Sequence, residues 1–115
     1  MKTGEIVSVG DAPDPVVRGE TATFTVTVKN TGNTIWSRGK VTVKIYKPGS
    51  TSVYTTKSLS ISNIAPGVEY TYNLKWAISS YSTTGTYRYD VYFYYGTSTL
   101  MDGDVGNPSN TIQVN

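Results

Sequence analysis

Histidine and cysteine are both missing from these 115 residues. Without them the common nucleophile–base triads cannot be assembled, a thiolate nucleophile is impossible, and zinc lacks its usual nitrogen and sulfur ligands. The missing cysteines also exclude disulfides, and with them the small disulfide-rich class of secreted domains. Most catalytic chemistry is therefore removed before any pattern in the chain is considered.

Long apolar runs, sustained helical periodicity and strong charge are missing as well. No stretch is apolar over enough residues to predict a membrane-spanning helix, so we expect no membrane insertion. Ten basic and eight acidic residues leave a net charge of only +2. Nucleic-acid-binding domains usually concentrate far more positive charge on one surface, so we expect no nucleic-acid partner. The densest basic group, residues 38–47, is interpreted as a solvated face.

Regular alternation of apolar and polar residues is what the chain does have. It is clearest in residues 20–30, 40–47, 68–76 and 85–95. A period of two places alternate side chains on opposite faces, which predicts β-strands with one buried face. Threonine and tyrosine are abundant, and both suit a pleated, half-buried surface.

The remaining strands are less regular. We expect them at residues 6–9, 16–17, 52–64 and 110–115. Prolines occur at edge strands and at switches between sheets, so Pro13 and Pro15 predict a first strand that is kinked in two. The segment 52–64 is interpreted as one or two short, edge-like strands, and residues 96–108 as a long loop.

About seven short strands, with turn signals every 8–12 residues or so, are typical of an all-β immunoglobulin/fibronectin-III-like sandwich of antiparallel strands. The length suits one such domain spanning residues 1–115. We expect the core at Phe24, Val26, Val43, Tyr72, Leu74, Tyr89 and Val91. Trp76 follows the same inward register, and Trp36 is expected to plug one end of the sandwich. Tyr87 follows Gly85 near the start of a strand, where such folds carry the tyrosine corner.

Several short motifs follow one another in the chain: Arg18-Gly19-Glu20, Phe24 through Asn30-Thr31-Gly32, Ile64-Ala65-Pro66-Gly67, Gly85-Thr86-Tyr87 and residues 107–114. In this order they resemble the CARDB-type domain, a cell-adhesion-related immunoglobulin-like module of bacterial and archaeal exported proteins. The resemblance implies a module of a larger secreted or cell-envelope protein that acts as a spacer or adhesive unit. It implies no catalytic residues. Its partners would be neighbouring domains of the same polypeptide, or a cell-surface protein or polysaccharide.

Outward-facing tyrosines are the first candidate site. Arg88 and Asp90 mark one face of residues 85–95 as the solvated one, because unpaired charges avoid burial. Tyr92 and Tyr94 share that face, and Tyr46 lies on the matching face of residues 40–47. Such aromatics can stack on sugar rings or anchor a protein partner, so these three are candidate ligand-binding residues. Contact with a neighbouring domain, or a plain surface, are the alternatives.

Acidic residues near the end of the chain form the second candidate site. Asp102, Asp104 and Asn107 cluster in a glycine-containing segment, and calcium prefers such clustered oxygens. The spacing does not follow the EF-hand loop, and a solvated turn is the alternative reading. A paired-carboxylate mechanism would need two acids about 5–10 Å apart. Glu69 and Asp90 are expected to face solvent on opposite sheets, so we expect no enzyme activity.

The sequence therefore predicts a non-catalytic structural or adhesive module. The alternative is a carbohydrate-binding or accessory module attached to an extracellular enzyme, using the exposed tyrosines. No cofactor is expected, apart from the calcium that the acidic segment would bind.

Overall fold

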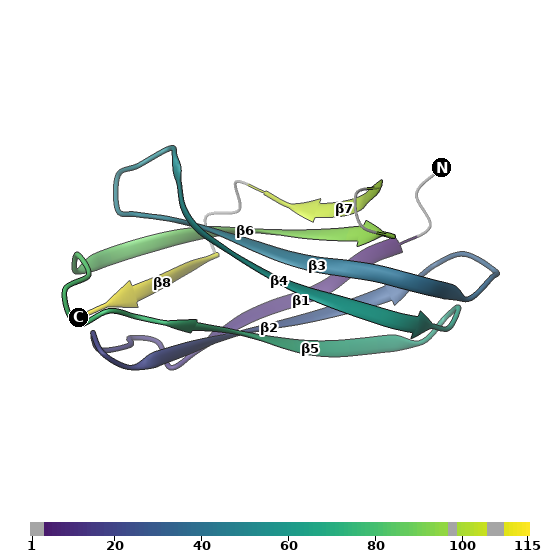
Figure 1. The fold of residues 1–115 in the computed structure, drawn as a ribbon, viewed down its shortest axis with the longest axis horizontal. Helices are drawn as coiled ribbons and strands as arrows, with labels where there is room; N and C mark the ends of the chain where they lie inside the picture. The colour runs from purple at the N-terminus through teal and green to yellow at the C-terminus, as the bar shows by residue number, and fades with distance from the viewer. Residues whose placement is uncertain (1–3, 97–98, 106–109) are drawn as a thin grey trace.

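Two packed antiparallel sheets make up the computed structural model, which describes residues 4–96, 99–105 and 110–115 (Figure 1). The three-stranded sheet has the order β1 (Gly4–Ala12), β2 (Thr21–Asn30) and β5 (Glu69–Ala77). The five-stranded sheet has the order β4 (Val53–Ile64), β3 (Trp36–Tyr46), β6 (Gly85–Tyr95) and β7 (Thr99–Asp104), and β8 (Thr111–Val114) also pairs with β6. The predicted all-β sandwich is confirmed.

The core lies between the sheets and follows the alternation of the sequence. Its completely buried aliphatic and aromatic side chains include Phe24, Val26, Val28, Val41, Val43, Ile45, Val91 and Phe93. Burying each such side chain is worth about 1.5–3 kcal/mol, so this layer supplies most of the driving force for folding. The predicted core residues are confirmed except for Tyr72, which is half-buried on the edge strand β5, where its ring stacks on Tyr70 at 6.3 Å.

Several strand limits differ from those expected. The segment 52–64 forms one unbroken strand, β4, which lies at the sheet edge as predicted and pairs with β3 along nearly its whole length. β3 itself begins at Trp36, four residues before the alternation becomes regular. The expected loop 96–108 contains a strand, β7, because Gly96 turns the chain back (φ 64°) and residues 99–104 pair with β6.

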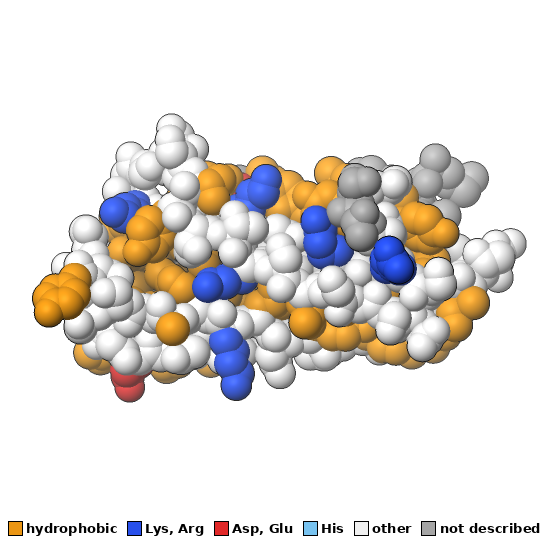
Figure 2. Space-filling view, in the orientation of Figure 1, with side chains coloured by type: hydrophobic (Ala, Val, Ile, Leu, Met, Phe, Trp, Pro, Cys, Tyr) orange, Lys and Arg blue, Asp and Glu red, His pale blue; other side chains and the backbone are white. Residues whose placement is uncertain are grey.

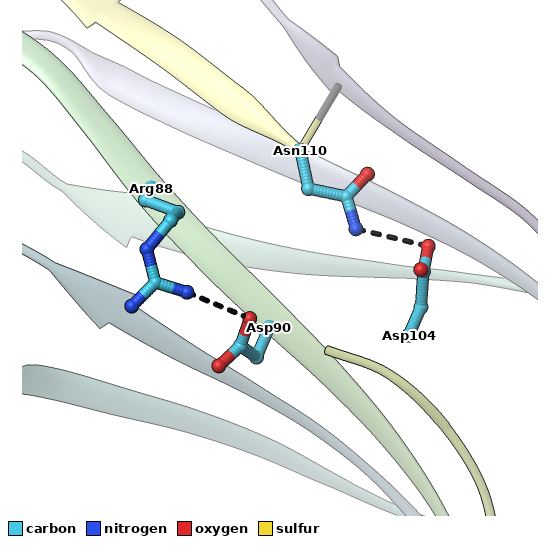
Figure 3. Close-up of polar contacts among 4 residues, drawn as sticks. All are labelled: Arg88, Asp90, Asp104 and Asn110. Carbon is cyan, nitrogen blue, oxygen red and sulfur yellow. Dashed lines mark hydrogen bonds and ion pairs between the residues drawn. The ribbon is translucent and has the colours of Figure 1, made fainter. Parts of the chain in front are cut away.

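β7 and β8 share one edge position, which reconciles eight strands with the expected seven. β7 pairs with the second half of β6 and β8 with the first half. Asn110 joins the two pieces: its side-chain amide donates to Asp104 (2.9 Å, Figure 3). Its backbone carbonyl accepts the Tyr89 backbone amide (3.0 Å). A buried asparagine with these bonds holds the interrupted edge against β6.

The proline-rich segment after β1 moves the chain from one sheet to the other. β1 pairs with β2 in the three-stranded sheet, whereas Val16 forms a parallel bridge with Val114 in the five-stranded sheet. The Val16 amide donates to Gln113 (2.8 Å), and the Asn115 amide donates back to Val16 (2.8 Å). The predicted kink between two half-strands is confirmed.

Three side chains fix the ends of the sandwich. The Tyr87 hydroxyl donates to the Thr83 carbonyl (2.6 Å), which is the tyrosine corner expected at this position. Trp36 is buried and packs against Phe93 with ring centroids 5.1 Å apart, so it plugs the opposite end. Asn30 is completely buried, and its side-chain amide donates to the Thr34 and Ile64 carbonyls, which ties the loop after β2 to the end of β4.

The molecule is elongated, with extents of 45 × 23 × 21 Å. β1 begins at one end of the long axis, and β8 finishes at the other, beside the chain's C-terminus (Figure 1). The chain therefore enters and leaves the sandwich at opposite poles.

Candidate functional site

The outward side of the five-stranded sheet gathers the predicted tyrosines and most of the dense basic group. We call it the basic–tyrosine face and define it by Arg38, Lys40, Lys44 and Tyr46 of β3 and Arg88, Asp90, Tyr92 and Tyr94 of β6. Lys40 lies opposite Tyr94 in the strand register, and Tyr46 lies opposite Arg88. A row of serines on β4, comprising Ser58, Ser60 and Ser62, continues the same side beyond β3.

One part of this face is buried, contrary to the expectation that Arg88 and Asp90 mark a solvated surface. Asp90 is 2 % exposed and Tyr46 is 8 % exposed. The Arg88 guanidinium forms an ion pair with Asp90 (3.1 Å, Figure 3) and lies 4.2 Å above the centre of the Tyr46 ring. The long arginine side chain neutralises the carboxylate and covers the ring, which offsets the desolvation free energy of burying them. Tyr46 therefore offers no open ring face for a ligand.

The tyrosine hydroxyls in this cluster remain protonated at neutral pH. Burial raises the pKa of Tyr46 above its usual value, and a hydrogen bond with Asp90 raises it further. Burial, followed by the nearby Asp90 charge, also raises the pKa of Tyr92. Both phenols thus act as hydrogen-bond donors and contribute no negative charge to the face.

Tyr92 and Tyr94 are half-buried and lie against each other, with ring centroids 6.2 Å apart and planes 25° from parallel. The Lys44 ammonium is 4.9 Å from the centre of Tyr92, and the Lys40 ammonium is 4.7 Å from the centre of Tyr94. Each cation is held by the negative face of a ring. The geometry is a pair of positioned cations on an aromatic base, and it differs from the open stacking platform that the sequence suggested.

A hollow of about 470 Å³ lies beside Arg38, where β3 and β4 run next to each other. It is lined by Ser37, Arg38, Ser60, Ile61 and Ser62. Its lining combines a guanidinium with serine hydroxyls, which are suited to hydrogen bonding with a polar ligand group. Figure 2 shows basic side chains along β3 and β4 on this side of the molecule, with little acidic surface among them.

Sequence reasoning named the tyrosines and missed the lysines that accompany them. Arg38, Lys40 and Lys44 all occupy even positions, as does Tyr46, so the period of two already placed them on one face. The sequence analysis used this period to place Tyr46, but it interpreted the basic group 38–47 as a solvated face and did not add its basic side chains to the candidate site.

Acidic side chains near the proline switch form a second polar group. The Tyr89 hydroxyl donates to Asp11 (2.7 Å), linking β6 to the end of β1. Burial raises the pKa of Asp11 to about 6; the Tyr89 hydrogen bond opposes this rise, and the neighbouring Asp14 adds to it. Burial, and then Asp11 itself, raise the pKa of Tyr89. Asp14 also accepts the Gln113 amide (3.1 Å), so both carboxylates have structural partners.

Two of the three candidate calcium ligands, Asp102 and Asp104, already accept hydrogen bonds from the protein. Asp102 accepts the amides of Ile6 (2.8 Å) and Gly103 (2.9 Å), one on each carboxylate oxygen. Asp104 accepts the Asn110 amide, and Asn107 lies outside the described residues. Within the described parts of the chain, no three acidic side chains converge as metal ligands would.

Glu69 and Asp90 lie in different sheets, as predicted, on β5 and β6. Glu69 is exposed, but Asp90 is buried beneath Arg88, so the expectation that both face solvent is wrong for Asp90.

The family of this chain follows from a comparison with family models. The model named CARDB matches residues 6–97, which span most of the sandwich. The chain is a CARDB domain. Domains of this family are generally non-catalytic modules and are typical of exported proteins.

Two solved structures resemble this CARDB domain. The CARDB domain of the PF1109 protein from Pyrococcus furiosus, solved in complex with di-metal ions, shares 21 % identity over 98 % of this chain and 90 % of its own, with a TM-score of 0.56. The sporulation control protein Spo0M from Bacillus subtilis shares 17 % identity, with a TM-score of 0.51, over 99 % of this chain and half of its own. At these identities the likeness establishes the fold. A comparison with curated proteins gives no significant match.

No helix with the length and apolarity needed to cross a membrane occurs in the described residues.

Proposed function

We propose that this CARDB domain is a non-catalytic structural and adhesive module of a larger secreted or cell-surface protein, in which it sets the distance between its neighbours. The observation that carries the proposal is the placement of the start of β1 and the end of β8 at opposite poles of a 45 Å sandwich. A domain entered at one pole and left at the other extends the polypeptide by its own length. A domain whose ends adjoin would add little reach.

The chemistry of the chain supports a role without catalysis. The sequence contains no histidine or cysteine, and the buried Asp90 and the half-buried Asp11 have structural partners in Arg88 and Tyr89. The core is made of close-packed aliphatic and aromatic side chains drawn from both sheets. Such a core favours a rigid body over one that opens around a substrate.

The spacer role can be tested by joining two copies head to tail through a short linker and measuring small-angle X-ray scattering. Stacked end to end, the pair should have a maximum dimension of about twice 45 Å. The single domain measured in parallel provides the reference. A pair that folds back into a side-by-side particle, with a maximum dimension close to that of one copy, would contradict the proposal.

A second candidate function is carbohydrate binding, as an accessory module of an extracellular enzyme. The observation that favours it is the pairing of Lys40 with Tyr94 and of Lys44 with Tyr92 on one sheet face. Cations on β3 beside aromatic rings on β6 are suited to a sugar polymer that carries charge. Tyr46 is not included, because its ring is covered by Arg88.

A further inference from the structure

We propose that the basic–tyrosine face binds a linear carboxylated polysaccharide, a polymer of uronic acid sugars. This inference deepens the second candidate function and rests on it. It is independent of the spacer role.

Charge is concentrated on this face. Its four basic residues and the one acid, Asp90, sum to +3, whereas the whole chain carries +2, so everything outside the face sums to −1. Asp90 is buried and ion-paired with Arg88. The cations of Arg38, Lys40 and Lys44 therefore remain for an outside partner of negative charge.

These three cations follow a line. They lie on the same side of one strand, β3, at alternate positions with Thr42 between the two lysines. At about 3.3 Å per residue, neighbouring positions on that side are about 7 Å apart, and the row from Arg38 to Lys44 extends over roughly 20 Å. A straight row of cations is complementary to an extended polyanion. A compact anion would reach only one or two of them.

The lysines are held in place before any ligand arrives. Lys40 and Lys44 each rest on a tyrosine ring, and the two rings rest on each other. A positioned ammonium loses less conformational entropy on binding than a freely rotating one. The ring occupies one side of each ammonium and leaves its other N–H groups able to donate to a carboxylate.

Hydroxyl groups accompany the cations, which favours a sugar over a protein partner. Ser58, Ser60 and Ser62 run beside the basic row, and two of them line the hollow next to Arg38. A guanidinium fork suits a carboxylate, and serine hydroxyls suit sugar hydroxyls. The large exposed hydrophobic side chains nearest the basic–tyrosine face are Val53 of β4 and Leu100 of β7, which lie opposite Tyr46 and Tyr94 at its two margins and leave its centre without such a side chain. Protein interfaces usually need such anchors at their centre.

The test is affinity electrophoresis in native gels that contain polygalacturonate, with the intact domain. Retardation should occur with polygalacturonate and disappear with its methyl-esterified form, which keeps the sugar backbone and removes the charge. The double variant Lys40→Ala/Lys44→Ala should bind roughly tenfold more weakly. The matched control Lys29→Ala/Lys75→Ala removes the same charge from the three-stranded sheet and should bind like the parent domain.

Three results would overturn the inference. They are absence of retardation by polygalacturonate, equal weakening by both double variants, and equal competition from a single-stranded oligonucleotide or an acidic peptide of matched charge. Both variants replace side chains that are at least partly exposed, and circular dichroism should confirm that they fold. A negative result for polysaccharide binding would not change the scattering result expected for two joined copies, so the binding proposal and the spacer proposal are tested independently.

Discussion

Tyr87 ties the loop before β6 to the core through a single hydroxyl. Its ring is completely buried, and its hydroxyl donates to the Thr83 carbonyl at 2.6 Å. The ring packs 5.2 Å from Trp76, so the position serves both the hydrophobic core and the loop. The two contributions can be separated, because phenylalanine keeps the ring and removes the hydroxyl.

We expect Tyr87→Phe to lower the free energy of unfolding by about 1 kcal/mol, the net worth of one hydrogen bond. Urea denaturation followed by tryptophan fluorescence measures it. Tyr81→Phe is the matched control, because Tyr81 is 94 % exposed, and it should leave stability unchanged. Equal stability of Tyr87→Phe and the parent would show that the corner hydrogen bond contributes nothing.

Asp11 gives the domain a predictable response to pH. Burial and Asp14 keep its folded-state pKa near 6, above the usual 3.8, despite the opposing hydrogen bond from Tyr89. The folded state therefore binds this proton more tightly than the unfolded chain does. The stabilisation is fully present below about pH 3.8 and is lost as pH rises through about 6.

We therefore expect the unfolding free energy to gain about 1 kcal/mol from this group between pH 7.5 and pH 5, after allowance for solvent screening. Asp11→Asn should remove that gain, since the amide cannot titrate while its oxygen still accepts from Tyr89. Denaturation at both pH values, for parent and variant, measures the difference. A variant with the parent's pH dependence would assign the effect to another carboxyl group.

At the level of elements, the pairing of β7 determines where the acidic side chains of this segment lie and which groups they contact. Because β7 pairs with β6 and approaches β1, the Asp102 carboxylate accepts the Ile6 amide and the Gly103 amide. One of its oxygens thus joins β7 to β1, and the other accepts the amide of the next residue within β7. The segment acts as part of the sheet edge, where the sequence alone suggested an exposed loop.

We expect calcium to leave the melting temperature unchanged, because a ligand stabilises a fold only where it finds a site in the folded state. Thermal unfolding with calcium chloride, with potassium chloride at equal ionic strength, and after a chelator provides the measurement. A calcium-specific rise that the chelator reverses would contradict this expectation and support Asp102, Asp104 and Asn107 as calcium ligands.

The strands differ in how far sequence could predict them. β6 was predicted with its observed limits, Gly85–Tyr95, because strict alternation is a local property of the chain. β7 was missed because its pairing contains a bulge opposite Phe93 and Tyr94, which disrupts any simple period. Its existence depends on the neighbouring strand, and a local pattern does not contain that information.

Prediction of the basic–tyrosine face from sequence has the same limit, because some of its contacts depend on neighbouring strands. The period of two correctly grouped Tyr46, Tyr92 and Tyr94 on one side, but it could not predict that Arg88 would cover Tyr46. That contact joins residues 42 positions apart and depends on strand register. Which side chains share a face was therefore predictable, and which of them stay open to solvent was not.

At the scale of the whole molecule, the two sheets are joined by the first segment of the chain itself. β1 belongs to one sheet, and the residues just after Pro15 belong to the other, where they run parallel to the last strand. Three backbone hydrogen bonds hold this parallel pair: Val16 to Gln113, Arg18 to Asn115, and Asn115 to Val16. The segment that follows β1 and the end of the domain are thereby fastened directly to each other.

That fastening has a mechanical consequence. Tension applied through the two termini would load β1 first, and the part of the load that passes beyond β1 would pull residues 16–18 toward one pole and residues 113–115 toward the other, along the direction of the strands. Parallel strands loaded in this way slide past each other in shear, so their hydrogen bonds must break together, whereas strands peeled apart lose them one at a time. A CARDB domain built like this would resist stretching at the parallel pair formed by residues 16–18 and 113–115.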